Sequence, residues 1–122
     1  MSWKVGYVTI GVRDLERAIE FYRDTLGLPL LYAAPEFHYA AFDAGGTRLS
    51  LASGGGESSI MHGLPHGNTG IGLVVPDVDA AYRELSAKGV EFTMAPQKQP
   101  WGGYMGMFAD PDGNVFYLDG AA

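Results

Sequence analysis

The hydrophobic pattern of the first fifty residues predicts one strand, one helix and three further strands. Residues 5–12 alternate as a half-buried strand does, and the apolar side chains after Asp14 recur at helical spacing to about residue 26. Asp14 is a typical N-cap, and Gly27 supplies the left-handed residue that ends the helix. Three short strands are then predicted at residues 29–34, 37–43 and 47–52. Residues 44–46 are predicted to form the turn between the last two.

The same order of elements then repeats. Residues 70–75 read as a strand, Asp77 caps a second helix, and Gly89 ends it. Three more strands are predicted at residues 90–95, 104–108 and 114–119. The last two are joined by the sequence Asp-Pro-Asp-Gly-Asn at 110–114, a turn in which Pro111 presets φ. The chain is therefore expected to form one domain of two βαβββ modules, residues 1–53 and 70–122, joined by a glycine-rich linker at 54–69.

This alternation also predicts where a ligand would bind. Each helix must cover one face of its own sheet, so the alternate residues of each strand face the other way. We expect an α+β fold in which two curved mixed sheets surround a cleft, with the helices on the outside, and such a cleft is the usual ligand site. The residues predicted to line it are Tyr7, Thr9, Arg48, Ser50, Ala52, Gly70, Gly72, Val74, Val115, Tyr117 and Asp119.

Composition narrows the classes of partner. The net charge of −6 on 122 residues opposes nucleic-acid binding and weakly favours a cationic small molecule. The absence of cysteine excludes disulfides, thiolate metal sites and a cysteine nucleophile. The chain starts without a leader-like segment and has no apolar stretch long enough to span a bilayer, so we expect a soluble, cytoplasmic protein without a membrane partner.

Three segments carry a family resemblance. The run from Tyr7 to Leu28, the restart at residues 70–80 and the signature at 110–118 resemble the vicinal oxygen chelate superfamily. This group includes glyoxalase I, extradiol dioxygenases, fosfomycin-modifying enzymes and the bleomycin-resistance binding proteins. The resemblance covers almost the whole chain apart from the linker, and it implies the fold more specifically than the activity.

The resemblance also identifies four positions at which metal-dependent members carry ligands. Their two histidines fall on Tyr7 and Gly70, and their two glutamates fall on Ser50 and Tyr117. Neutral hydroxyl groups and a glycine are not competent ligands for a divalent ion, so the sequence predicts no metal site and no cofactor there. A shift of one residue in the alignment would not restore the site, because the neighbouring residues belong to the helix-covered face.

The three histidines offer little alternative. His62 and His66 have the spacing of two ligands on a helix, but Gly63 and Pro65 indicate a loop, so we interpret both as solvated. His38 begins a predicted strand and is either an ordinary, partly exposed residue or a ligand contact. No serine or histidine stands in a nucleophile elbow, and the glycines at 54–56 lack the lysine of a phosphate loop, so no catalytic residue is assigned.

Aromatic and polar side chains remain as candidates for ligand binding. Tyr7 and Tyr117, one from each module, are expected to face each other, with Trp101 on a loop over the cleft mouth. Aromatic surfaces bind flat or cationic ligands at about 0.5–2 kcal/mol per contact, whereas Arg48 suits an anionic group. The alternative is that both tyrosines fill the cleft and hydrogen-bond each other. The predicted ligand-binding residues are Tyr7, Thr9, His38, Arg48, Ser50, Trp101, Tyr104 and Tyr117.

The leading hypothesis is a metal-free protein that binds and sequesters an aromatic or cationic small molecule. It is similar in character to the bleomycin-resistance branch, which also implies a homodimer. The first alternative is an enzyme of the same superfamily: a lyase or dioxygenase with a non-standard metal site, or a metal-free isomerase that uses a tyrosine hydroxyl as its acid. The second alternative is an interaction module whose cleft is closed.

Overall fold

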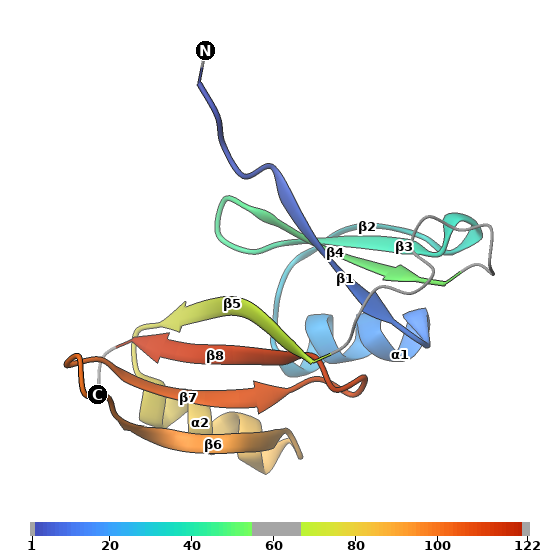
Figure 1. The fold of residues 1–122 in the computed structure, drawn as a ribbon. Helices are drawn as coiled ribbons and strands as arrows, with labels where there is room; N and C mark the ends of the chain where they lie inside the picture. Colours follow the sequence, from blue (N-terminus) through green and yellow to red (C-terminus); the bar gives the residue numbers. More distant parts are fainter. Residues whose placement is uncertain (1, 55–66, 121–122) are drawn as a thin grey trace. The chain divides into compact units, whose positions relative to one another are not determined.

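A computed structural model describes residues 2–54 and 67–120 of the chain. The chain divides into two compact units, residues 1–66 and residues 67–122, and each unit contains one four-stranded mixed sheet (Figure 1). Within the described residues, no helix has the length and apolar character needed to cross a membrane.

Unit 1 has the strand order β1-β4-β3-β2. β1 runs parallel to β4, and the other neighbours are antiparallel. The helix α1 and a π-helical turn (η1) lie between β1 and β2, and a 3₁₀ turn (η2) lies between β2 and β3. The elements are β1 Tyr7–Val12, α1 Leu15–Glu20, η1 Phe21–Thr25, β2 Leu30–Ala34, η2 Pro35–Phe37, β3 Tyr39–Asp43 and β4 Arg48–Ser53.

The ends of α1 and η1 follow from local chemistry. The Asp14 side chain accepts a hydrogen bond from the backbone N–H of Arg17 at 3.2 Å, which satisfies one of the helix's unpaired donors. Gly27, at φ 77°, turns the chain away after η1. α1 packs against β3 and β4, and the Tyr22 ring, fully buried, lies 5.9 Å from the ring of Phe42. The apolar face of this sheet is therefore the one that carries α1.

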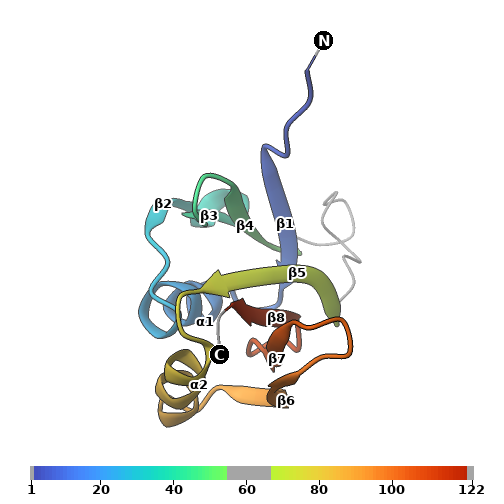
Figure 2. The same cartoon turned by 90° about the vertical axis from the view of Figure 1, so that its left-hand side faces the viewer.

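Unit 2 repeats the arrangement with the strand order β5-β8-β7-β6. β5 is parallel to β8, and α2 packs against β6 and β8 (Figure 2). The rings of Phe108 and Phe116, both fully buried, stack with their centroids 5.6 Å apart. The elements are β5 Asn68–Val75, α2 Val78–Ala87, β6 Glu91–Lys98, β7 Tyr104–Ala109 and β8 Val115–Gly120.

The turn between β7 and β8 is organised by one buried carboxylate. Asp110 Oδ1 accepts hydrogen bonds from the backbone N–H groups of Asp112 at 2.9 Å and Asn114 at 2.8 Å. Its Oδ2 accepts from Asn114 Nδ2 at 3.0 Å, and Gly113 takes φ 85°. The Asp-Pro-Asp-Gly-Asn sequence thus forms a hydrogen-bonded turn of the kind predicted.

The predicted α+β fold of two βαβββ modules is confirmed, with shifts at several boundaries. Ser53 belongs to β4, and residues 68 and 69, predicted as linker, begin β5. β1 begins at Tyr7 rather than at residue 5, and β6 continues to Lys98 with two irregularities in its pairing to β7. The predicted strand at 37–43 begins only at residue 39, because η2 comes first.

Candidate functional site

The face of the unit 1 sheet opposite α1 carries four of the eight predicted binding residues. Side chains that are register partners on neighbouring strands point to the same face of a sheet. Tyr7 pairs with Arg48, Thr9 pairs with Ser50, and Ser50 pairs in turn with Ala41 on β3. The register therefore brings Tyr7, Thr9, Arg48 and Ser50 together on one face, as predicted from their alternation.

Arg48 lies between two tyrosine rings on this face. Its guanidinium carbon is 5.6 Å from the centroid of the Tyr7 ring and 5.9 Å from that of the Tyr32 ring. Both distances are within the range of a cation–π contact, and Nη1 donates a long hydrogen bond of 3.4 Å to the Tyr32 hydroxyl. The β3 partner of Tyr32 is Ala41. Because Ala41 has only a methyl side chain, Arg48 on β4 has room to reach across β3 to Tyr32 on β2.

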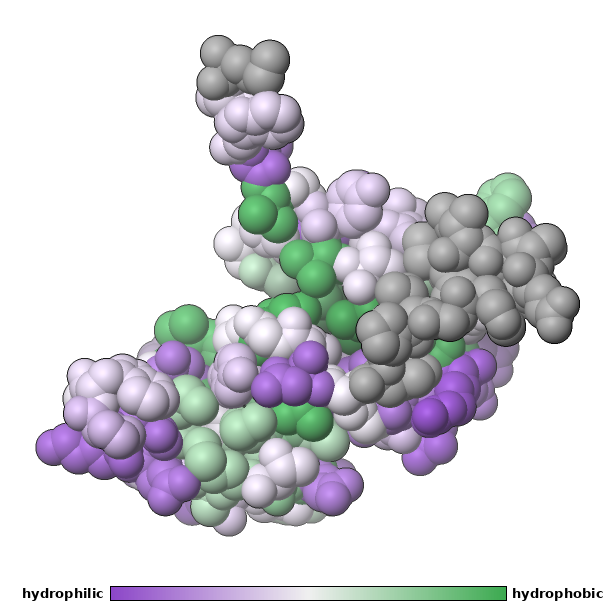
Figure 3. Space-filling model, in the orientation of Figure 1, coloured by the Kyte–Doolittle hydropathy of each residue, from purple (hydrophilic) through white to green (hydrophobic). Residues whose placement is uncertain are grey.

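Two more tyrosine contacts extend this arrangement. The centroids of the Tyr32 and Tyr39 rings are 5.9 Å apart, and the Tyr39 hydroxyl is hydrogen-bonded to the Ser50 hydroxyl at 2.6 Å. We call Tyr7, Arg48, Tyr32 and Tyr39 the arginine–tyrosine row. Ser50 itself is fully buried, so it lies beneath the row rather than in contact with solvent. Figure 3 shows one exposed surface of this unit, where apolar residues continue from the N-terminal segment onto β1.

The row contains two residues that the sequence analysis did not select. Tyr32 and Tyr39 lie on β2 and β3, whereas the cleft residues predicted for the first module lie on β1 and β4. Alternation on β3 does place Tyr39 on the face opposite the buried Phe42, so a signal existed for that residue. For Tyr32 the signal is weaker, because the pairing of β2 with β3 is irregular between Leu30 and Tyr32.

The corresponding face of unit 2 carries Tyr117 and several methionines, with Asp119 opposite Met105. Tyr117 pairs with Gly72 on one side and with Met107 on the other, and Met107 pairs with Met94. The Tyr117 hydroxyl accepts a hydrogen bond from Asn68 Nδ2 at 3.1 Å. Methionine adapts to irregular apolar ligands, so these side chains suit a binding wall.

Tyr104 lies on the other face of the unit 2 sheet. It shares the side of Phe108 on β7, and its hydroxyl donates a hydrogen bond of 2.6 Å to the Asp79 carboxylate in the first turn of α2. The bond to Asp79 raises the pKa of the Tyr104 hydroxyl above its ordinary value of 10.0. The sequence analysis predicted a ligand contact for Tyr104; in the structure its hydroxyl joins β7 to α2.

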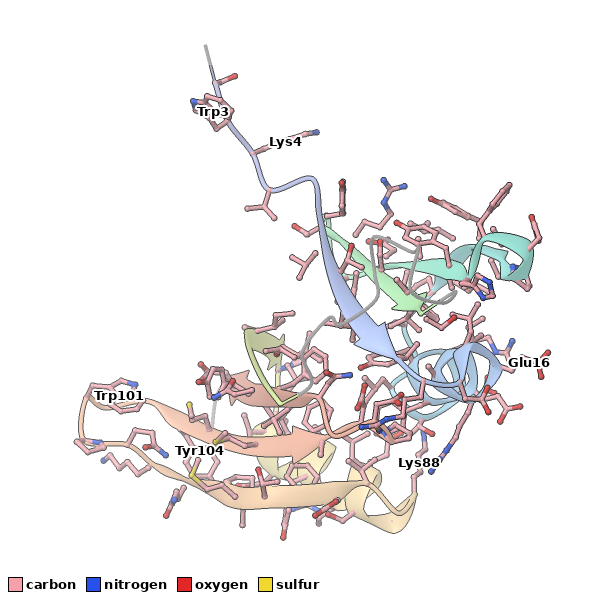
Figure 4. All side chains as sticks on the ribbon, turned by 45° about the vertical axis from the view of Figure 1, so that its right-hand side comes forward. Trp3, Lys4, Glu16, Lys88, Trp101 and Tyr104 are labelled. Carbon is pink, nitrogen blue, oxygen red and sulfur yellow. The ribbon has the colours of Figure 1, made fainter. Side chains whose placement is uncertain are left out.

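Trp101 is exposed at the tip of the β6–β7 hairpin, with 71% of its surface accessible. The backbone N–H of Gln99 donates to the carbonyl of Gly103 at 2.7 Å, and that of Gly102 donates to the carbonyl of Gln99 at 2.9 Å. A Cβ atom at Gly103 would lie 2.8 Å from the indole Nε1, so the ring lies back against its own turn. Figure 4 shows Trp101 at this tip, with Tyr104 following it on β7.

Of the three histidines, His38 alone lies within the described residues, and it is outside every strand. His38 ends η2 in the left-handed region, at φ 56°, and is exposed. The sequence analysis placed it near the start of the strand predicted at 37–43, whereas β3 begins at Tyr39. His62 and His66 lie outside the described residues.

The four family ligand positions do not offer a donor set for a divalent ion. Tyr7 has the Arg48 cation near its ring, and the Ser50 hydroxyl is hydrogen-bonded to Tyr39. The Tyr117 hydroxyl already accepts from Asn68, and Gly70 has no side chain. Among residues 2–54 and 67–120 there is no group of three histidine, aspartate or glutamate side chains placed to hold a metal. The side chains at these positions do not fit a metal centre.

Comparison with known proteins agrees with the fold and the resemblance. The family model described as Glyoxalase/Bleomycin resistance protein/Dioxygenase superfamily matches residues 4–118. A crystal structure of a member of that superfamily from Sphaerobacter thermophilus is 34% identical, with a TM-score of 0.84 and 98% of each chain covered. The structure of TnmS3, an antibiotic binding protein from a Streptomyces species, is 30% identical, with a TM-score of 0.81, covering 99% of this chain and 98% of that one. A lactoylglutathione lyase of Haemophilus influenzae is 30% identical, covering 90% of this chain and 87% of its own.

Proposed function

Because the chain belongs to the glyoxalase/bleomycin resistance protein/dioxygenase superfamily, we propose that it is a metal-free protein that binds and sequesters a small aromatic molecule. The observation that carries the proposal is the chemistry of the four family ligand positions. Two phenols, a buried hydroxyl and a glycine stand where metal-dependent members hold an ion. The Ser50 and Tyr117 hydroxyl groups are hydrogen-bonded to other side chains, and the Tyr7 ring contacts Arg48. Without a metal to activate a substrate, binding is the function that the remaining side chains support best.

The aromatic content of the sheet faces supports this reading. The arginine–tyrosine row offers three rings and one planar cation on a single face, and Tyr7 and Tyr32 remain 59% and 45% exposed. Tyr117 and the methionines offer a second apolar face in unit 2. Rings and thioethers of this kind bind flat apolar compounds through the area of apolar contact, and no reaction is needed. The similarity to the antibiotic binding protein TnmS3 points in the same direction.

Two measurements on the full-length protein test the proposal. Elemental analysis of the protein purified without chelators is expected to give substoichiometric Zn, Ni, Fe and Mn, and adding these ions is expected to leave the melting temperature unchanged. Titration with a panel of planar aromatic compounds is expected to quench tryptophan emission in a saturable way, with Trp101→Phe and Trp3→Phe assigning the signal. Stoichiometric metal, or a panel without any saturable response, would contradict the proposal.

A catalytic function is the second candidate, favoured by the similarity to the lactoylglutathione lyase. In that case a tyrosine hydroxyl is the available acid at the family ligand positions, through Tyr7 or Tyr117. Lactoylglutathione lyase activity above background, abolished by Tyr7→Phe or Tyr117→Phe in a protein that still folds, would establish it. Activity that appears only when a metal is added would instead indicate a non-standard metal site.

Family resemblance also leads us to propose that the protein is a homodimer. Sedimentation equilibrium is expected to give twice the mass of one chain. A mass equal to one chain at micromolar concentration would contradict the proposal.

A further inference from the structure

Arg48 is the feature of the unit 1 face that the proposed function leaves unexplained. The chain has 14 acidic residues and 8 basic ones, so carboxylate partners for an arginine are abundant in the sequence. Within residues 2–54 and 67–120, however, no carboxylate lies within ion-pair distance of Arg48. Its described contacts are the faces of two tyrosine rings and one tyrosine hydroxyl.

The carboxylate opposite Arg48 on the neighbouring strand is engaged elsewhere. Asp43 is the register partner of Arg48 on β3, which is where a cross-strand ion pair would form. Its Oδ1 instead accepts hydrogen bonds from the backbone N–H groups of Gly45 at 3.1 Å and Gly46 at 3.2 Å. The β3–β4 turn thus draws the carboxylate away from Arg48. The fold leaves the guanidinium as a positive group on an otherwise uncharged part of the row.

Contact with the rings leaves the hydrogen-bonding edge of the guanidinium available. A cation over a ring uses the face of its planar group, whereas its N–H donors point outward in the plane. Arg48 has five such donors, and the one described bond to Tyr32 is long, at 3.4 Å. A carboxylate meets this edge with two parallel hydrogen bonds, and the flanking rings limit its hydration.

Together these observations predict that the unit 1 face prefers a ligand that is both flat and negatively charged. The geometry points to an aromatic carboxylate as the ligand class of this face, with its anionic group on the Arg48 guanidinium and its ring against Tyr7 or Tyr32. This inference rests on the proposed function, because it names the class of molecule bound at the same face. It also differs from the expectation of a cationic ligand. The net charge of −6 favours a cation, but the positive charge of Arg48 on this face opposes one.

Three probes of matched size test the inference: 1-naphthoate, 1-naphthamide and 1-naphthylmethylammonium, each titrated into the full-length protein by calorimetry. The carboxylate is expected to bind at least tenfold more tightly than the amide, and the ammonium most weakly. Arg48→Gln is expected to remove this preference and leave affinity for the amide within twofold. Arg48→Lys, which keeps the charge, is expected to retain the preference with lower affinity. In NMR spectra of protein labelled with ¹⁵N-arginine, the Nε resonance of Arg48 is expected to shift when naphthoate is added and to stay unchanged with the other two probes.

Arg17→Gln is the matched control, since it removes the same charge from exposed α1 on the opposite side of this sheet. Equal affinity for the three probes, tighter binding of the ammonium, or a carboxylate preference that survives Arg48→Gln would overturn the inference. Those results would leave the proposed function standing, because binding would still occur. Absence of binding by all three probes would also overturn it, and the broader aromatic panel would then decide the proposed function separately.

Discussion

The buried carboxylate of Asp110 is expected to stabilise the fold far more than an exposed carboxylate in the same kind of turn. Asp110 is 5% exposed and Asn114 is 1% exposed. In Asp110→Ala, the backbone N–H and the Nδ2 of Asn114 both lose the acceptor described above. Each buried donor that loses its acceptor costs about 1–3 kcal/mol, so the expected loss in free energy of unfolding for these two is roughly 2–6 kcal/mol.

Asp43 provides the matched comparison within the same chain. It too accepts from two backbone N–H groups in a hairpin turn, but it is exposed, so water replaces it when it is removed. Asp43→Ala is expected to cost less than about 1 kcal/mol. Asp110→Asn keeps one acceptor oxygen and is expected to fall between the two.

Urea unfolding followed by far-ultraviolet circular dichroism measures these differences. With a slope of about 2 kcal/mol per molar urea, Asp110→Ala is expected to lower the midpoint by roughly 1–3 M. Asp43→Ala is expected to lower it by less than about 0.5 M, with the slope unchanged in both variants. Equal losses at the two positions would refute the reasoning, since burial would then not determine the cost of losing the acceptor.

Three further predictions follow from contacts in unit 2. Gly106→Ala places a Cβ 2.9 Å from a backbone carbonyl oxygen of β6 and is expected to lower the free energy of unfolding by about 1–3 kcal/mol, whereas Gly72→Ala, with its nearest atom at 3.9 Å, is expected to change little in the same urea assay. Tyr104→Phe is expected to lower the melting temperature at neutral pH. Because Asp79 raises the pKa of Tyr104 in the folded state, this difference is fully present below about pH 10, the unfolded pKa, and is lost as the pH rises through the folded pKa; a difference that grew with pH would contradict this sign. Phe116→Ala removes a fully buried ring and is expected to cost about 3–5 kcal/mol in urea unfolding, and a loss below about 1 kcal/mol would contradict the packing described here.

Local signals made most of the fold predictable. Asp14 with Gly27, and Asp77 with Gly89, bracket the two helical segments, because an N-cap carboxylate and a left-handed glycine act through their own neighbouring backbone. Strand alternation identified the two faces of each sheet for the same reason. The boundaries that shifted depend on more distant partners, as at Asn68, whose place in β5 follows from its pairing with β8.

The site was predictable only in part. Alternation placed Tyr7 and Arg48 on one face, but their contacts with Tyr32 depend on the order of strands in the sheet, which adjacent sequence does not encode. Tyr104 was assigned by its nearness to the hairpin tip, although its parity with Phe108 already indicated the helix-covered face. The left-handed conformation at position 38 could not be predicted, because the residue there is a histidine and not the glycine or asparagine that usually adopts it.

The arginine–tyrosine row draws one side chain from each of the four strands of its sheet, while the core of that unit lies on the opposite face. Tyr7 and Tyr32, its two exposed members, can therefore be exchanged without opening a void behind them. Such exchanges are expected to change the proposed ligand preference at little cost to the thermal stability of the scaffold.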